Sequence, residues 1–343
     1  MTEIINAQPD MEVCAAAQDP LFALKYMEKQ WPDVITLDVE MPRMDGITFL
    51  KKIMKEHPTP VVMCSTLTEK GAETTMQAMS AGAIEIVTKP KMGVKGFLQE
   101  SANEIVLAIK AASKAKLKRL VSNTSVPVPD IKKKLNADVV LKSTPTAMVR
   151  TTERIIAIGT STGGTSALEK LLTVLPSVSP GIVVVQHMPG SFTKAFANRL
   201  NSICEVTVKE AVDGESLLSG HVYIAPGDQH MFIQRSGAVY KIVVKDGPLV
   251  SRHKPSVDVL FRSVAQVAGK NAMGIIMTGM GDDGANGLLE MKQAGSYTVA
   301  ESEASCVVYG MPKEAVKKGA VDKVMHLNEF APAIMDYYHA GLK

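Results

Sequence analysis

The sequence predicts two α/β domains, each built around a largely parallel β-sheet. β-rich runs alternate with amphipathic helical stretches over residues 1–110, and a second alternation of this kind starts at Arg154. Such alternation is typical of βαβ units with parallel strands. The chain of 343 residues also fits two domains of ~100–200 residues each better than a single domain.

The N-terminal region contains four predicted strands and four predicted helices. The strands cover residues 11–17, 33–39, 60–66 and 83–89, and the helices cover 20–30, 47–57, 72–82 and 97–113. The sequence therefore predicts a compact parallel-sheet domain over residues 1–110.

A basic stretch follows this domain. Residues 110–150 contain eight Lys, two Arg and two Asp, include prolines, and have no aromatic residue to interleave with the positive charge. We interpret this stretch as a solvated linker and expect no nucleic-acid partner. The expected divisions are 1–110, a linker at 111–150, and a C-terminal domain at 151–343.

The C-terminal region repeats the alternation around a glycine-rich turn. Predicted strands cover 154–159, 181–187, 271–279 and 297–302, and predicted helices cover 165–175, 191–203, 257–269 and 285–295. Residues 221–247 carry a Ser-Gly pair between two β-rich runs, which favours an antiparallel hairpin. The pattern predicts a doubly wound, mostly parallel α/β domain with an antiparallel hairpin.

Three residues with reactive side chains each follow a predicted strand of this domain. Ser161 lies in the turn GTSTGG, His187 ends the run VVVQH, and Asp283 lies in the turn TGMGDDG. Ligands of open α/β sheets bind outside the carboxyl ends of the strands, so we expect these side chains to meet there. The spacing predicts a serine nucleophile, a histidine base and a carboxylate that orients the histidine.

Two neighbouring residues compete for these roles. Asp282 could supply the carboxylate instead of Asp283, and His253 is either a second histidine of the site or a surface residue. A nucleotide site is disfavoured because GTSTGG lacks the GxGxxG spacing and no GxxxxGK[ST] motif is present. The order Ser, His, Asp also differs from the Ser, Asp, His order of α/β-hydrolases.

A set of motifs in this half resembles the chemotaxis protein-glutamate methylesterases, the CheB family. The motifs are GTSTGG, QHMPGSFTKAFANRLN, YIAPGDQHM, RHKPSVDVLF, TGMGDDGANG and EASCVVYGMP. The resemblance implies Ser161 as nucleophile, His187 as base, Asp283 as the orienting acid, and the Met280 backbone as an oxyanion-hole donor. It implies glutamate methyl esters and specific glutamines on chemoreceptor helices as substrates, with no cofactor for catalysis.

The N-terminal half resembles a response-regulator receiver domain, which has a flavodoxin-like fold. Asp38 in ITLDVEMPRMDG matches the phospho-acceptor, Ser65 in VVMCST matches the hydroxyl residue beside it, and Lys89 in VTKP matches the supporting lysine. The resemblance implies a chemotaxis histidine kinase as phosphodonor and Mg²⁺ for phosphorylation. It also implies that the unphosphorylated receiver obstructs the catalytic face.

The receiver resemblance is incomplete at its start. Receivers open with a strand that ends in two acidic residues, whereas MTEIINAQPD is typical of the end of the first helix. We expect an N-terminally truncated receiver with an incomplete Mg²⁺ site. In the receiver sheet order 2-1-3-4-5 the missing strand is central, so its loss would remove backbone partners from two strands.

The composition of the chain and the segments it lacks predict where the protein is located. No signal peptide and no apolar run of ~20 residues is present, so we expect a cytoplasmic protein without direct membrane insertion. The four cysteines are widely spaced and show no CxxC pair, so we expect buried free thiols. Two rival functions remain: a response regulator that acts by binding alone, and an esterase for small soluble esters.

Overall fold

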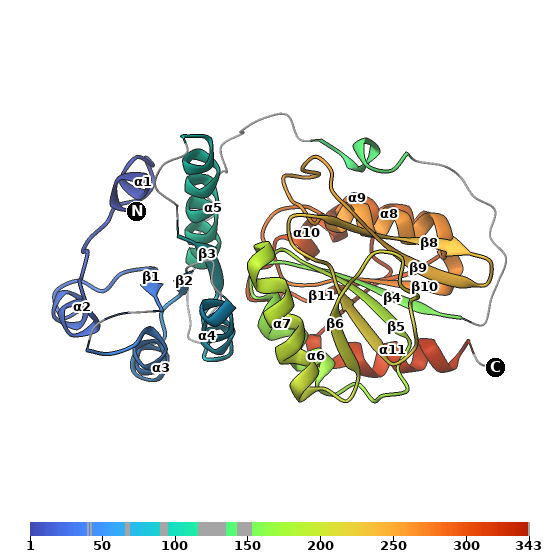
Figure 1. Cartoon of the computed structure of the whole chain (residues 1–343), viewed down its shortest axis with the longest axis horizontal. Helices are drawn as coiled ribbons and strands as arrows, with labels where there is room; N and C mark the ends of the chain where they lie inside the picture. The colour runs from blue at the N-terminus through green and yellow to red at the C-terminus, as the bar shows by residue number, and fades with distance from the viewer. Residues whose placement is uncertain are drawn as a thin grey trace. The chain divides into compact units, whose positions relative to one another are not determined.

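The computed structural model describes residues 1–39, 41, 43–65, 69–89, 95–115, 135–142 and 153–341. The chain separates into two compact units, Met1–Arg119 and Leu120–Lys343 (Figure 1). In the described ranges, no helix combines the length and the apolar character needed to cross a bilayer.

The N-terminal unit contains a three-stranded parallel sheet in the order β1-β2-β3. Its strands are β1 (Ile35–Asp38), β2 (Val61–Ser65) and β3 (Glu85–Thr88). Its helices are α1 (Thr2–Asn6), α2 (Pro20–Met27), α3 (Gly46–Glu56), α4 (Glu69–Ser80) and α5 (Lys95–Ser113). Side-chain caps begin two of them, since Asp19 accepts hydrogen bonds at the start of α2 and Asp45 does so at the start of α3.

The predicted strand at residues 11–17 is wrong. These residues form neither helix nor strand, and most of them are exposed, including Cys14. In the receiver order 2-1-3-4-5 this run would pair only with the first strand, which the described sheet lacks. Without that partner the run makes local hydrogen bonds instead, from Val13 N to Asn6 Oδ1 at 2.9 Å and from Met11 N to the Gln8 carbonyl at 3.4 Å. The expectation of four buried thiols fails at Cys14, which is exposed, and at Cys204, which is half-buried, whereas Cys64 and Cys306 are buried.

The C-terminal unit is built on a seven-stranded parallel sheet in the order β12-β11-β10-β4-β5-β7-β6. The strands are β4 (Ile155–Thr160), β5 (Gly181–Gln186), β6 (Thr207–Glu210), β7 (His221–Ile224), β10 (Ala272–Ile276), β11 (Tyr297–Glu301) and β12 (Lys323–Met325). From β4 the chain continues to β5 on one side, whereas β10 lies on the other. The topological switch point, where ligands of such sheets bind, therefore lies between β4 and β10.

Helices cover both faces of this sheet, so the doubly wound prediction is confirmed (Figure 1). The helices are α6 (Gly164–Leu172), α7 (Gly190–Ile203), α8 (Val257–Val267), α9 (Ala285–Gln293), α10 (Met311–Lys317) and α11 (Phe330–His339). The predicted antiparallel hairpin is also confirmed as β8 (His230–Ser236) paired with β9 (Val239–Lys245). The short strands β6 and β12 were not predicted.

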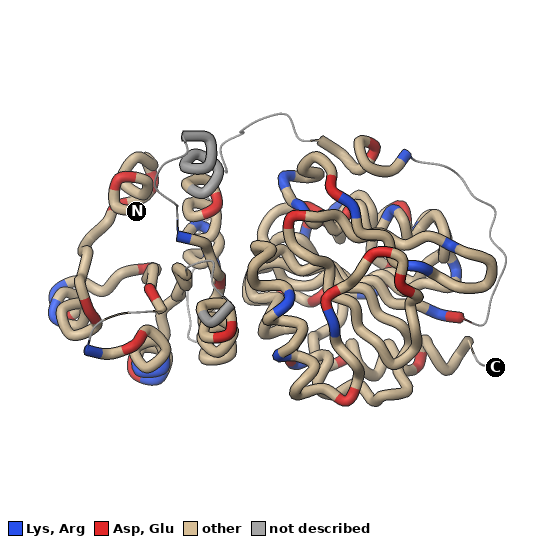
Figure 2. The backbone as a smooth tube through the Cα atoms, in the orientation of Figure 1, with Lys and Arg blue, Asp and Glu red and all other residues tan. Residues whose placement is uncertain are grey.

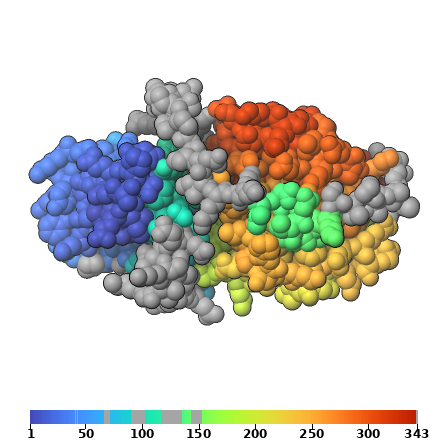
Figure 3. All heavy atoms as spheres, turned by 90° about the horizontal axis from the view of Figure 1, so that it is seen from above, coloured from blue at the N-terminus to red at the C-terminus, as the bar shows by residue number. Residues whose placement is uncertain are grey.

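Residues 135–142, here called the docked segment, pack on the C-terminal unit (Figure 3). Arg262 of α8 donates hydrogen bonds to Asp138 Oδ1 at 2.6 Å and to the Leu141 carbonyl at 3.0 Å. The Leu135 carbonyl accepts a hydrogen bond from Ser251 N at 2.9 Å. This part of the expected linker is therefore fixed to the domain that follows it, close to the loop that carries His253.

Charges of both signs are interspersed over the C-terminal unit (Figure 2). One of them, Arg262, also binds both carboxylate oxygens of Glu290, at 2.8 and 2.6 Å. Such two-point pairing restrains the guanidinium strongly. Arg262 therefore links α8, α9 and the docked segment.

Candidate active site

The strand register brings Ser161 and His187 to the same edge of the sheet. Thr160, the last residue of β4, pairs with Gln186, the last residue of β5. Ser161 and His187 are the next residues of the two strands, and His187 N donates a hydrogen bond to the Thr160 carbonyl at 3.1 Å. The two side chains that sequence reasoning placed together therefore follow neighbouring strand ends.

The turn after β10 contacts Ser161 from the side opposite β5. Ser161 N donates to the Thr278 carbonyl at 3.0 Å. A Cβ on Gly279 would lie 2.8 Å from Ser161 Cβ and 2.4 Å from Met311 Sδ, so only glycine fits this approach. Gly163, at φ +79°, then turns the chain into α6. These glycines allow the sharp strand-to-helix turn that exposes a serine hydroxyl.

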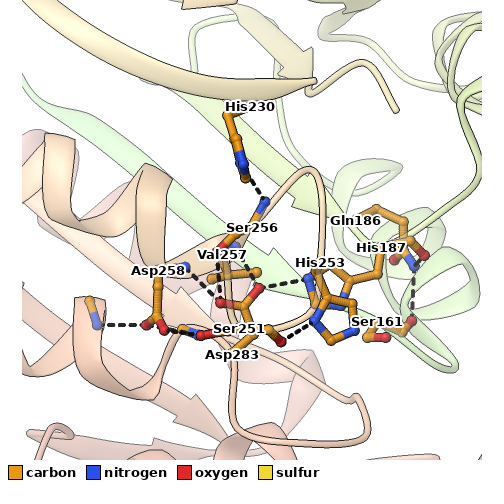
Figure 4. Close-up of polar contacts among 12 residues, drawn as sticks. Ser161, Gln186, His187, His230, Ser251, His253, Ser256, Val257, Asp258 and Asp283 are labelled. Atoms are coloured by element: carbon orange, nitrogen blue, oxygen red, sulfur yellow. Dashed lines mark hydrogen bonds and ion pairs between the residues drawn. The ribbon is translucent and has the colours of Figure 1, made fainter. Parts of the chain in front are cut away.

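His187 is hydrogen-bonded to Asp283, with 2.8 Å between Nε2 and Oδ2 (Figure 4). Because the carboxylate can only accept, Nε2 carries the hydrogen, and Nδ1 keeps the lone pair in the neutral ring. His187 Nδ1 is buried and has no hydrogen-bond partner among the described residues. The ring therefore presents one unengaged nitrogen as a base.

The start of α8 holds the Asp283 carboxylate. Oδ1 accepts from Ser256 Oγ at 2.8 Å and from Asp258 N at 3.0 Å, while Oδ2 accepts from Val257 N at 2.8 Å. Burial alone raises the pKa of Asp283, but the hydrogen bond and charge of His187, with the backbone donors, lower it to about 2. Asp283 is therefore ionised at neutral pH although it is fully buried.

Asp258 makes the reciprocal contact to α9. Its Oδ1 accepts from Gly284 N at 3.0 Å and from Gly287 N at 2.8 Å, at the beginning of that helix. The start of α8 thus binds Asp283 from the turn before α9, and the start of α9 binds Asp258 from the first turn of α8. This exchange fixes the turn that carries Asp283 against α8.

The structure shows where the residues of the two alternatives left open by the sequence lie. The carboxylate that is hydrogen-bonded to His187 is that of Asp283. His253 is a histidine of the site, because its ring stacks on His187 with 3.7 Å between centroids and 5° between planes. His187, His253 and Asp283 offer ligand atoms within 4.8 Å of one another. The rings of His187 and His253 are stacked in parallel, so their nitrogen lone pairs point in parallel planes. This arrangement does not direct both lone pairs at a single metal ion.

Met280 lies in the turn that approaches Ser161. Its neighbour Gly279 is fixed by hydrogen bonds from Gly279 N to Val308 O (3.0 Å) and from Met311 N to Gly279 O (2.9 Å). Within the described part of the chain, no backbone hydrogen bond engages Met280 N. The amide is thus available beside the serine.

Two buried residues support the site and were missed from sequence. Gln186 Nε2 donates to the carbonyls of Ser161 (3.0 Å) and His187 (2.9 Å), joining the two strand ends (Figure 4). Glu301 Oε2 accepts from Thr278 N at 2.8 Å, and burial raises the pKa of this carboxyl. The only sequence signal for either residue was a polar side chain at the end of an apolar strand. This signal does not distinguish a residue that supports the site from one that reacts.

His230 is a structural histidine behind the site. Its Nε2 donates to the Pro248 carbonyl at 2.8 Å, and its Nδ1 accepts from Ser256 N at 3.3 Å. This pairing requires the neutral ring, and burial lowers the pKa of His230 accordingly. The residue supports Ser256, which in turn supports Asp283.

The N-terminal unit brings its three predicted residues to one sheet edge. Lys89 forms an ion pair with Asp38, and Lys89 N donates to the Ser65 carbonyl at 2.9 Å. Ser65 is buried, and its Oγ accepts from Thr75 Oγ1 at 2.9 Å. Across the described residues, the one set of three or more metal-ligating side chains lies in the other unit. Among the described residues, Asp38 therefore belongs to no set of three metal-ligating side chains, and its ion-pair partner is Lys89.

A serine, a histidine and a buried carboxylate at one sheet edge define a serine hydrolase class of site. The CheB methylesterase family model matches residues 156–334, and the response regulator receiver domain model matches residues 1–95. This chain belongs to the CheB methylesterase family.

Two relatives and one solved structure support this assignment. The protein-glutamate methylesterase/protein-glutamine glutaminase 1 of Photobacterium profundum is 62% identical over 343 residues, 99% of this chain and 97% of that protein. Enzyme 3 of the same name from Shewanella oneidensis is 62% identical, over 98% of this chain and 95% of that protein. The CheB methylesterase catalytic domain of Thermotoga maritima is 37% identical with a TM-score of 0.53, covering 54% of this chain and 98% of that one.

Proposed function

We propose that this chain hydrolyses glutamate methyl esters on methyl-accepting chemotaxis receptors and deamidates specific receptor glutamines, under control of receiver phosphorylation. The observation that carries the proposal is the hydrogen bond between His187 and a buried, ionised Asp283, beside Ser161. The names and domain composition of the relatives supply the substrate class. The division at 1–110, 111–150 and 151–343 remains part of the proposal.

Ser161 is the proposed nucleophile. As its Oγ attacks the ester carbonyl carbon, the hydroxyl proton moves to His187 Nδ1, the ring nitrogen without a partner. Asp283 holds the opposite side of the ring and stabilises the imidazolium that forms. The Met280 N–H and the start of α6 stabilise the carbonyl oxygen as it becomes negative.

Collapse of the tetrahedral intermediate breaks the bond to the leaving group. His187 gives its proton to the departing ester oxygen, which leaves as methanol, or to the departing amide nitrogen, which leaves as ammonia, and a glutamyl–Ser161 ester remains. Water then attacks this acyl-enzyme with His187 as base again, giving glutamate and free serine. One set of residues therefore serves both proposed reactions.

The proposed control acts through Asp38. Receiver domains usually take up a phosphoryl group with Mg²⁺, and Lys89 and Ser65 are the groups proposed to support it here. The proposed donor is a chemotaxis histidine kinase, and the proposed setting is the cytoplasm. The described residues supply the acceptor carboxylate, the lysine and the hydroxyl of the proposed site.

Substrate class is tested by methanol release. We expect turnover of methylated receptor to exceed turnover of free glutamate γ-methyl ester by at least ~100-fold in kcat/KM, because binding energy from the receptor helix contributes to the transition state. Equal kcat/KM on both substrates would identify an esterase for small esters. Absence of release from either, together with no labelling of Ser161 by diisopropyl fluorophosphate, would support a regulator that acts by binding alone.

Removal of residues 1–134 is expected to raise basal methanol release about tenfold, because an obstructing receiver leaves only part of the population competent. The deletion ends before the docked segment, because Asp138 of this segment accepts a hydrogen bond from Arg262 of the C-terminal unit. Basal activity is measured on methylated receptor without a phosphodonor. Activity equal to or lower than that of the full chain would contradict autoinhibition.

A further inference from the structure

His253 lies directly against the proposed base. Its ring is nearly parallel to that of His187, with 3.7 Å between centroids, so the two imidazoles are in face-to-face van der Waals contact (Figure 4). One face of His187 is thus covered by an aromatic ring while its edge is held by Asp283. Nothing in the proposed reaction steps uses this second histidine.

A strained turn holds His253 in place. Val250 and His253 exchange two backbone hydrogen bonds, of 3.1 and 2.9 Å, across Ser251 and Arg252. Both turn residues have left-handed backbone, with φ of +51° and +73°, a conformation that usually requires Gly or Asn. Such strain persists only where surrounding contacts enforce it, and it concentrates at functional sites.

Three hydrogen bonds, two from side chains and one between backbone groups, hold this turn. Ser251 Oγ donates to Asp258 Oδ2 at 2.8 Å, and Ser251 N donates to the Leu135 carbonyl of the docked segment at 2.9 Å. His253 Nδ1 donates to the Ser251 carbonyl at 2.8 Å. That hydrogen bond fixes the rotation of the His253 ring and therefore the plane on which His187 rests.

We propose that His253 is a positioning residue that fixes the ring plane of His187 and stabilises its protonated form by stacking. This inference rests on the proposed function. An aromatic face attracts a cation, and the attraction is stronger where water is excluded. When His187 takes the Ser161 proton, its positive charge forms against the face of His253 and beside the Asp283 carboxylate. The stack thus acts where the transition state gains charge.

Other charges face this pair and act on both rings together. The groups on the elements around His253 are Asp283, Asp258, Arg252, Lys254 and His230. Asp283 favours a proton on either ring and Arg252 opposes one on His253, while the charge of Lys254 is offset by Asp246 at 2.7 Å. Because the proposed base must be unprotonated to accept the Ser161 proton, the pH profile of the rate is a measure of the stack.

Three variants separate the ring from its hydrogen bond. His253→Phe keeps an aromatic face and loses the Nδ1 donor, His253→Gln keeps a donor and loses the ring, and His253→Ala loses both. We measure kcat and KM on methylated receptor, and the rate at which diisopropyl fluorophosphate labels Ser161, from pH 5 to 9. Labelling requires an activated serine whatever the natural substrate is, so it tests His253 even if the proposed substrate is wrong.

We expect His253→Ala and His253→Gln to lower kcat and the labelling rate about tenfold with KM nearly unchanged. The acid limb of both profiles moves to lower pH, because the protonated base has lost its stabilising neighbour. His253→Phe stays within about threefold of the wild type.

Three results would overturn the proposal. Alanine at the wild-type rate with an unchanged pH profile shows that the stack does not matter. Rescue by Gln and not by Phe shows that only the hydrogen bond to Ser251 matters. Equal loss in all three variants with an unmoved acid limb shows a purely structural role. Far-UV circular dichroism confirms that each variant is folded.

Discussion

Ser161→Ala lowers methanol release from methylated receptor by at least ~10⁴-fold, to the limit of detection. Loss of the nucleophile removes the covalent route and leaves only what the oxyanion donors and binding supply. Among the residues described, no hydrogen bond is made by the Ser161 side-chain hydroxyl, so the fold loses little with it. Receptor binding and the thermal midpoint are therefore expected to stay near the wild-type values.

Ser202→Ala is the matched control for this substitution. Ser202 is an exposed serine near the end of α7, at the opposite end of that helix from the loop that carries His187. It should release methanol at the wild-type rate. If Ser161→Ala retained more than about 1% of wild-type kcat, the nucleophile assignment would be wrong. Identical loss in Ser202→Ala would instead point to a defect in preparation.

Asp283→Ala lowers kcat by about 10⁴-fold and also destabilises the C-terminal unit by about 3 kcal/mol. The activity is lost because His187 loses the group that fixes its tautomer. The stability is lost because Ser256 Oγ, Val257 N and Asp258 N are left buried without their acceptor. Ser161→Ala is expected to lose activity without losing stability. Comparing the two variants therefore distinguishes the effect on catalysis from the effect on folding.

Denaturant unfolding measures the second effect. Trp31, the single tryptophan, lies in the N-terminal unit, so its fluorescence serves as an internal control while circular dichroism follows the whole chain. Asp282→Ala is the matched variant, because the carboxylate hydrogen-bonded to His187 belongs to the adjacent Asp283. It should keep both activity and stability. Comparable losses in both aspartate variants would contradict the geometry.

The stability effect of Asp283 depends on pH in a defined direction. The pKa of this carboxyl is about 2 in the folded chain against an ordinary value of 3.8. A lowered pKa contributes stability above pH ~4, and the contribution is lost as the pH falls from about 4 to about 2. It amounts to about 2 kcal/mol. The stability difference between wild type and Asp283→Ala should therefore shrink over that interval.

Much of this site follows from strand ends alone. Ser161 and His187 directly follow two strands that pair in register, and any parallel arrangement of these strands places them at one edge. The turn that holds Asp283 follows a third strand of the same sheet. Periodicity and turn chemistry therefore predicted which elements meet, as well as the hairpin and both parallel sheets.

Details set by tertiary contacts were beyond the sequence pattern. The choice between Asp282 and Asp283 depends on which carboxylate faces the start of α8. The stack of His253 depends on left-handed backbone at Ser251 and Arg252, which no local propensity favours. The docked segment reads as polar linker because Asp138 meets its partner Arg262 only in the folded domain.

The reciprocal contacts that Asp283 makes to the start of α8 and Asp258 makes to the start of α9 have a consequence for sequence divergence in this family. Asp283 holds α8 and Asp258 holds α9, so both carboxylates remain under selection for folding even where catalysis is no longer needed. A descendant that has lost Ser161 should still retain both aspartates. Persistence of the acid in a diverged relative is then evidence of a preserved scaffold, and the serine is the position whose loss reports that the chemistry has gone.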